Sequence, residues 1–170
     1  MSPIRFSGEA LLPSVTSRGW NNRYFIDTEF TDAEQRQLIS LAIVGENGHE
    51  FYGERNDFEV ASCTDFVREV VLPQLGQFNG RSMRLPHLRD ALRDWFDRIP
   101  VIGGPVLCYD LEADIDLLRE LLEGQLPAGW ALDNIATQID DRRRALYYAR
   151  YGGKHHALHD ARANAWASGS

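Results

Sequence analysis

The stretch that decides the fold is residues 23–30, with the sequence RYFIDTEF. Its aromatic and β-branched residues from 23 to 27 are typical of a β-strand. A second apolar run covers residues 38–44, and a third, at 50–52, follows the turn pair Asn47-Gly48. Because the connections between the three runs are short, the sequence predicts an antiparallel meander of three strands.

The remainder of the chain changes to helical spacing, interrupted by one buried strand at 105–109. Helices are predicted at 65–75, 86–99, 111–122, 140–150 and 156–167. Strands first, followed by alternating helices and strands, predict an α/β fold with a mixed sheet and helices packed on it. Residues 1–20 are rich in Ser, Gly and Pro and are expected to be an N-terminal extension of a single domain at 21–170.

The composition limits the class of protein. The 170 residues suit one domain, and 25 acidic against 18 basic residues give a formal charge of −7. Proteins that coat nucleic acid are usually basic, but an acidic protein can act on a polyanion when its carboxylates hold divalent cations. No stretch approaches the ~20 apolar residues of a membrane span, and the start lacks a signal-peptide core, so we expect a cytoplasmic protein.

The first candidate site is the pair Asp27 and Glu29 at the end of the first strand. Side chains alternate along a strand, so residues two apart point to the same side of the sheet. Each carboxylate raises the pKa of the other unless a cation lies between them. Hard cations such as Mg²⁺ prefer oxygen ligands, so the pair indicates a metal site; a solvated turn is the alternative.

The second candidate is Asp110, at the end of the strand 105–109. The alternative role for it is the N-cap of the helix that follows. Four further acids lie in that helix, and we expect them on its solvated face, opposite the leucines. They are Glu112, Asp114, Asp116 and Glu120.

The third candidate is the segment KHHALHD at 154–160, in which three histidines precede Asp160. Zinc is the other interpretation, because His is a common zinc ligand. No cysteine lies nearby, however, and the spacing matches no standard zinc finger. A histidine beside metal-bound carboxylates is better suited to accept a proton from water.

Together and in this order, the three segments resemble the DEDD exonuclease superfamily. His155, five residues before Asp160, makes the chain similar to the DEDDh branch, closest to the small bacterial 3'→5' exoribonucleases of the mycobacterial polyadenylate-specific type. The resemblance implies an RNase H-like mixed central sheet, with three antiparallel strands first and parallel strands after them. The chain departs from the pattern at residues 103–105, where Gly-Gly-Pro stands in a region that often carries an Asn.

The resemblance also implies the roles of the site residues. Two Mg²⁺ or Mn²⁺ ions would be held by Asp27, Glu29, Asp110 and Asp160, with Asp27 the best candidate to contact both ions. His155 would be the general base that takes the proton of the attacking water. His156 is the alternative base, because it lies four residues from Asp160 and could share a helical face with it.

The implied substrate is the 3' end of RNA, which would be shortened by release of nucleoside monophosphates. Phe30 and Thr28 are candidate substrate-binding residues: Phe30 for stacking on a base, with core packing as the alternative. A locally basic window at 141–162 is either a solvated helix face or a guide for the phosphate backbone. Single-stranded DNA is the alternative substrate. The alternative classes of protein are a non-catalytic nucleic-acid-binding module and an unrelated structural domain. A homodimer is expected by analogy only.

Overall fold

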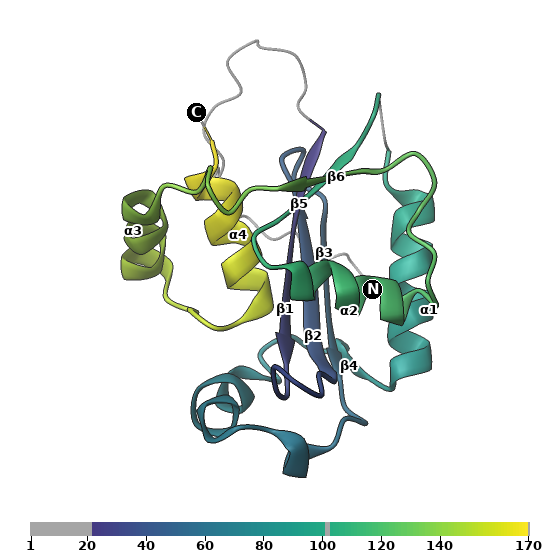
Figure 1. Cartoon of the computed structure of the whole chain (residues 1–170), viewed down its shortest axis with the longest axis vertical. Helices are drawn as coiled ribbons and strands as arrows, with labels where there is room; N and C mark the ends of the chain where they lie inside the picture. Colours follow the sequence, from purple (N-terminus) through teal and green to yellow (C-terminus); the bar gives the residue numbers. More distant parts are fainter. Residues whose placement is uncertain (1–21, 101–102, 170) are drawn as a thin grey trace.

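A computed structural model of the chain describes residues 22–100 and 103–169, so the expected extension at 1–20 lies outside the described residues. These residues form a six-stranded sheet in the order β4-β3-β2-β1-β5-β6 (Figure 1). The strands are β1 (Arg23–Phe30), β2 (Leu38–Gly45), β3 (Glu50–Arg55), β4 (Ser82–Met83), β5 (Val106–Tyr109) and β6 (Ala131–Asn134).

The pairing of the strands is mixed. β1, β2 and β3 are antiparallel neighbours, whereas β5 runs parallel to β1, and β6 parallel to β5. Two-residue β4 pairs in parallel with β3 at the other edge. The predicted α/β fold, with an antiparallel meander followed by parallel strands, is therefore confirmed; the short strands β4 and β6 were not predicted.

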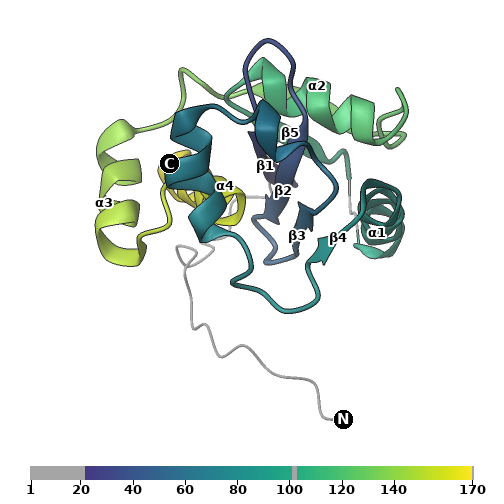
Figure 2. The same cartoon turned by 90° about the horizontal axis from the view of Figure 1, so that it is seen from below.

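Helices cover both faces of the sheet (Figures 1 and 2). They are α1 (Leu85–Arg98), α2 (Glu112–Leu121), α3 (Asp141–Tyr151) and α4 (Ala157–Ala167). α1 packs on β3 and α2 on β1 and β5, while α4 packs on β1 and β2 and carries α3 on its outer side. None of the helices in the described ranges is long and apolar enough to cross a membrane.

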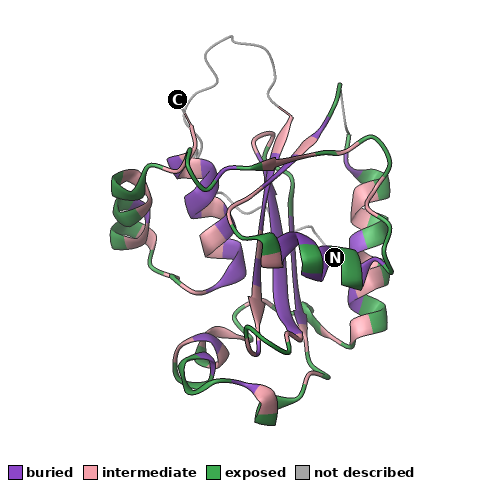
Figure 3. Ribbon diagram, viewed as in Figure 1, coloured by how far each residue is buried: buried purple, intermediate pink, exposed green. Residues whose placement is uncertain are grey.

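The alternation of β1 divides the interior into two apolar clusters. Tyr24 and Ile26 belong to the cluster beneath α1 and α2, whereas Phe25 belongs to the cluster beneath α4. Figure 3 shows the buried residues concentrated in the central strands and on the inner sides of the helices. By the same alternation, Asp27 and Glu29 share the α4 face with Phe25.

α1 begins with Pro86 in its first turn and ends just before Pro100. Leu88 and Leu92 on its inner side are fully buried. A Cβ atom on Gly53 of β3 would lie 2.3 Å from Cδ1 of Leu88, so any other residue at this position would displace the Leu88 side chain. The glycine therefore allows Leu88 of α1 to pack directly against the backbone of β3.

The segment predicted as a helix at 65–75 is less regular than expected. Its centre, Val67–Val71, is a π-helix, and Leu72–Gln74 is a 3₁₀ turn. Pro73 has no N–H to donate, which prevents a regular α-helix from continuing through this point. Val67 and Val71 pack with Ile39 of β2 in a third, small apolar cluster.

A stripe of small residues brings α4 close to the sheet. Ala157, Ala161 and Ala165 recur every four residues and are buried in the cluster that contains Phe25. The distance between packed elements depends on the side chains at the contact, so alanines allow a short one. Asp160, in the first turn of α4, is thereby carried towards the end of β1.

We predict that Ala161→Leu lowers the free energy of unfolding by about 1–3 kcal/mol, because extra methyl groups overpack a filled interior. Urea denaturation followed by circular dichroism measures the change. Ala149→Leu, at an exposed position of α3, is the matched control and should change the free energy of unfolding little. Equal effects of the two substitutions would contradict the close packing of α4.

Candidate active site

Carboxylates from β1 and α4 meet at the end of the sheet. Asp27, Glu29 and Asp160 each offer an oxygen, and these three atoms lie within 4.8 Å of one another. Asp27 and Glu29 reach this point because they share the α4 face of β1. Asp160 reaches it because α4 packs closely on the same face.

Asp110 joins Asp27 from the neighbouring strand. Phe25 of β1 pairs with Cys108 of β5, and the parallel register, continued by two residues, sets Asp110 beside Asp27. Oxygens of Asp27, Asp110 and Asp114 also lie within 4.8 Å of one another. The structure therefore brings all four predicted acids together, with Asp27 common to both groups.

The N-cap alternative for Asp110 does not hold. α2 begins at Glu112, its N-cap is Leu111, and no side chain caps it. The Asp110 side chain instead lines a cleft of about 380 Å³ with Asp27, Asp160 and His155.

Asp114 corrects an expectation from the sequence, which predicted it on the solvated face of its helix. It is fully buried, and its Oδ1 atom accepts hydrogen bonds from the backbone N–H of Thr28 (3.0 Å) and from the Thr28 hydroxyl (2.7 Å). The prediction failed because α2 packs across the end of β5 onto β1, which buries Asp114 together with Ile115. The other three acids of the helix are exposed as expected: Glu112, Asp116 and Glu120.

The acids of this site repel one another in a poorly solvated environment. Burial, aided by Asp114 and Asp160, raises the pKa of Asp27 well above its usual value. Burial and then repulsion from Asp160 raise the pKa of Glu29 to about 8. Burial likewise raises the pKa of Asp114 to about 7 and that of Asp160 to about 6.

The donor atoms fit a hard divalent cation. Three buried carboxylate oxygens have no hydrogen-bond partner: Oδ2 of Asp27, Oδ1 of Asp110 and Oδ2 of Asp114. Buried polar atoms are normally paired, so three such oxygens in one place are suited to bind a cation. A set of ligands made only of oxygens suits Mg²⁺ or Mn²⁺ better than zinc, which is usually bound by nitrogen and sulfur.

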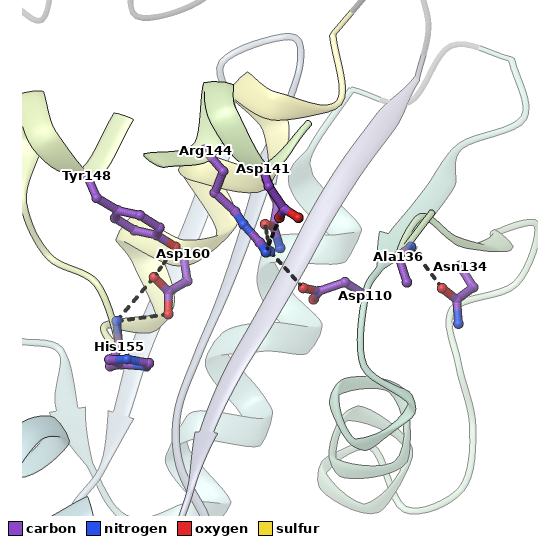
Figure 4. A network of polar contacts seen from close by, with 9 residues as sticks. Asp110, Asn134, Ala136, Asp141, Arg144, Tyr148, His155 and Asp160 are labelled. Atoms are coloured by element: carbon purple, nitrogen blue, oxygen red, sulfur yellow. Dashed lines mark hydrogen bonds and ion pairs between the residues drawn. The ribbon is translucent and has the colours of Figure 1, made fainter. Parts of the chain in front are cut away.

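Side chains of α3 hold two of the acids from outside (Figure 4). The Tyr148 hydroxyl donates to Oδ1 of Asp160 at 2.6 Å, and Nη1 of Arg144 lies 3.4 Å from Oδ2 of Asp110. The backbone N–H of His155 also donates to both oxygens of Asp160, at 3.1 and 3.2 Å. Tyr148 was not predicted from the sequence, because nothing in the spacing of α3 shows which of its tyrosines reaches Asp160.

His155 lies on the loop before α4 and lines the cleft. Its backbone is left-handed, with φ 65°, and Nε2 of Gln74 donates to the carbonyl oxygens of Lys154 (2.8 Å) and His155 (3.2 Å). The half-exposed ring of Phe66 meets the His155 ring edge-on at 5.0 Å. Burial lowers the pKa of His155, which favours the neutral ring that can accept a proton.

His156, the alternative base, lies behind this surface. Only 2% of it is exposed, and its ring stacks on Tyr52 with Nε2 3.1 Å from the Tyr52 hydroxyl oxygen. The same hydroxyl donates to Oε1 of Glu54 at 2.7 Å. Burial lowers the pKa of His156 to about 4. The geometry therefore favours His155 over His156 as the group that meets a substrate.

The two predicted substrate-binding residues of β1 do not face the cleft. The hydroxyl of Thr28 is buried and bound to Asp114. Phe30 is partly buried and packs on the main apolar cluster, which supports the alternative of core packing. The aromatic ring that lies exposed beside His155 is instead that of Phe66, which was not predicted from the sequence.

The basic side chains of the window at 141–162 lie in different places. Arg144 and Lys154 line the cleft. Arg162 pairs with Glu50 (2.7 Å), and Arg150 lies over the ring of Tyr151, away from the acids. Two cations of the window can therefore meet a phosphate at the cleft.

We predict that the metal-free protein becomes less stable as the pH rises from about 7 to about 9. Carboxyl groups with raised pKa values hold more protons in the folded chain than in the unfolded chain, so deprotonation favours unfolding. The histidines with lowered pKa values act in the opposite direction, but only below about pH 7, where unfolded histidine titrates. Urea denaturation in EDTA at several pH values measures the slope.

Asp27→Asn serves as the control for this pH dependence. It removes one of the repelling charges, so the slope between pH 7 and 9 should become smaller in EDTA. A wild-type protein whose stability rises over this range, or a variant with the wild-type slope, would contradict the electrostatic account.

Comparisons with known sequences give a partial match. No known protein-family model matches the chain. A curated 3'-5' exoribonuclease of Mycobacterium tuberculosis, present in two strains, is 43% identical to it over 54 residues. The match covers 31% of this chain and 32% of the relative, so it spans about a third of the length of the curated relatives.

Two solved structures share the fold over most of the chain. Pop2p of S. pombe, in its Mg²⁺- and Mn²⁺-bound form, aligns with a TM-score of 0.61 at 12% identity, covering 85% of this chain and 80% of that one. Cell-death related nuclease 4 aligns with a TM-score of 0.55 at 15% identity, covering 84% and 60%. The chain therefore shares the fold of these two structures, and the predicted resemblance agrees with the partial match to a 3'-5' exoribonuclease.

Proposed function

We propose that the protein is a metal-dependent 3'→5' exonuclease that acts on RNA and releases nucleoside monophosphates. The observation that carries the proposal is that two groups of three acids, which have Asp27 in common, lie beside an open cleft. Such a site gathers divalent cations next to a surface that a phosphodiester can reach. The partial match to a 3'-5' exoribonuclease supports the reaction and the choice of RNA.

The proposed ligands are four acids from three parts of the fold: strand β1, the segment after β5, and α4. Asp27 belongs to both groups of acids and would contact both ions. Glu29 and Asp160 complete one group, and Asp110 belongs to the other. Bound divalent cations supply positive charge that lowers the pKa of water and offsets the charge that develops on the phosphate and the leaving 3'-oxygen. Tyr148 and Arg144 orient the carboxylates of Asp160 and Asp110.

His155 would act as the general base. Water attacks the terminal phosphorus, its proton passes to the His155 ring, and the bond between phosphorus and the 3'-oxygen breaks. The leaving 3'-oxygen then takes a proton from solvent, and the protonated His155 returns its proton to solvent. The hydrogen bonds from Gln74 to the loop backbone hold the ring at the cleft.

Arg144 and Lys154 line the same cleft and would contact phosphate oxygens. Phe66 would stack on a base, a contact that contributes about 1–3 kcal/mol without requiring a particular sequence. A 3'→5' exonuclease of DNA would use the same acids and base, so the choice between substrates depends on contacts to the 2'-hydroxyl. A non-catalytic binding module is less favoured, because such a module has no need of the buried acids.

We predict that 5'-labelled single-stranded RNA, incubated with the full chain and Mg²⁺ or Mn²⁺, gives a ladder that shortens from the 3' end. EDTA should stop the reaction, and Asp27→Asn should abolish it while leaving a folded protein. A matched DNA oligonucleotide, run in parallel, distinguishes the two nucleic acids. Internal cleavage, or cleavage that persists in EDTA, would exclude the proposed reaction.

We predict that His155→Ala lowers kcat by about 10²–10⁴-fold, the usual contribution of a general base. The variant should also lose the lower limb of the pH–rate profile, because the titrating base is gone. His156→Gln keeps a polar group near Tyr52 and is the matched control, with a much smaller loss. A larger loss in His156→Gln than in His155→Ala, with both proteins folded, would reverse the assignment.

A further inference from the structure

Asp114 is an acid that the proposed reaction does not use, although it lies among the acids that it does use. The residue is fully buried, and one of its oxygens lies within 4.8 Å of oxygens of Asp27 and Asp110. Both hydrogen bonds that it accepts from Thr28 go to Oδ1. Its Oδ2 atom is buried and has no hydrogen-bond partner.

A structural role for Asp114 accounts for only half of this arrangement. The N–H and hydroxyl of Thr28 need one acceptor oxygen, which a neutral asparagine would supply equally well. A carboxylate adds a second oxygen, which here has no hydrogen-bond partner, and it places a negative charge on a group that lies close to two other carboxylates. Burying such a charge is costly unless an opposite charge accompanies it.

The protein itself provides little of that opposite charge. Within residues 22–100 and 103–169, Arg144 is the one basic side chain that forms an ion pair with any of the five acids. Its contact with Asp110 is long, at 3.4 Å, and it is shared with the exposed Asp141 at 2.8 Å. When all five acids are ionised, their charge can be offset only by cations from solution, and two divalent ions would offset four of the five charges.

We propose that Asp114 supplies a fifth carboxylate to the cation site formed by Asp27 and Asp110, and so holds a divalent cation there before any nucleic acid binds. This inference rests on the proposed function, because it concerns the same metal centre. Without Asp114, that group of acids would offer two protein carboxylates; with it, the group offers three, as many as the group of Asp27, Glu29 and Asp160. The bonds from Thr28 keep Asp114 oriented towards the other two acids.

Binding of Mn²⁺ alone to the full chain tests the inference, by isothermal titration calorimetry without nucleic acid. Asp114→Asn keeps the shape of the side chain and an acceptor for Thr28 but removes the charge. It should weaken Mn²⁺ binding by about 10–100-fold, the range seen when groups that orient or support a metal site are changed. Asp116→Asn, an exposed acid on the same helix, should leave the affinity unchanged.

Urea denaturation in EDTA separates loss of charge from loss of structure. Asp114→Asn should be at least as stable as the wild type without metal, because it removes a buried repulsive charge, and should gain less stability when Mn²⁺ is added. If Asp114→Asn does not fold, crystals of the wild type soaked in Mn²⁺ give the answer. An anomalous peak contacting Asp114, directly or through one water, supports the inference; peaks that all lie out of its reach overturn it.

The outcomes distinguish this inference from the proposed function. A wild type that degrades RNA, together with an Asp114→Asn variant that binds Mn²⁺ as tightly as the wild type, overturns the role of Asp114 and leaves the exonuclease standing. If the wild type degrades no nucleic acid but Asp114→Asn binds Mn²⁺ more weakly than the wild type does, the result supports the cation site and excludes the proposed reaction.

Discussion

The buried carboxylates around Asp27 repel one another, and the packing of the surrounding elements must hold them together against this repulsion. Four other acids lie near this side chain, and burial raises its pKa well above the usual value. The acids cannot move apart, because each lies in, or directly next to, an element fixed by packing elsewhere. Apolar clusters on both faces of the sheet hold β1, α2 and α4 in place. The chain thus uses packing energy to maintain an arrangement whose repulsion is relieved by bound cations or by protonation.

The different lengths of neighbouring strands explain why the site lies at this end of the sheet. β5 ends at Tyr109, whereas β1 continues to Phe30, so the end of β1 has no parallel neighbour beside it. The chain that leaves β5 supplies Asp110 and then α2, which crosses to the side of β1 that carries Thr28. α4 approaches from the opposite face. Acids from both faces can therefore meet around Asp27 only beyond the end of β5, the usual place for ligands in sheets with parallel strands.

Much of this could be predicted from the sequence, because the information is local. The strand at 23–30 shows its own alternation, and Asp27 and Glu29 follow from its period of two. Tertiary contacts decided the rest. The burial of Asp114 depends on where α2 crosses β1, and the position of Tyr148 depends on how α3 packs on α4. β4 has only two residues, too few to show a pattern, and β6, with the sequence ALDN, lacks the β-branched and aromatic residues that mark the equally short β5. Thr28 was expected to meet substrate, but the alternation that directs Asp27 towards α4 directs Thr28 towards α2.

This alternation couples the two faces of β1. Asp27 on one side and Thr28 on the other are adjacent residues, so the hydrogen bonds between Thr28 and Asp114 also fix the backbone that carries Asp27. On the α4 side, Asp160 is fixed in turn by Tyr148 and by the backbone of His155. Hydrogen bonds on both faces of β1 therefore fix the site: those of Asp114 act on the α2 side, and those of Asp160 act on the α4 side. A displacement of β1 would change both carboxylate groups at once, because Asp27 belongs to each of them. The buried contact of Thr28 with Asp114, although it faces away from the cleft, is therefore part of what holds the site together.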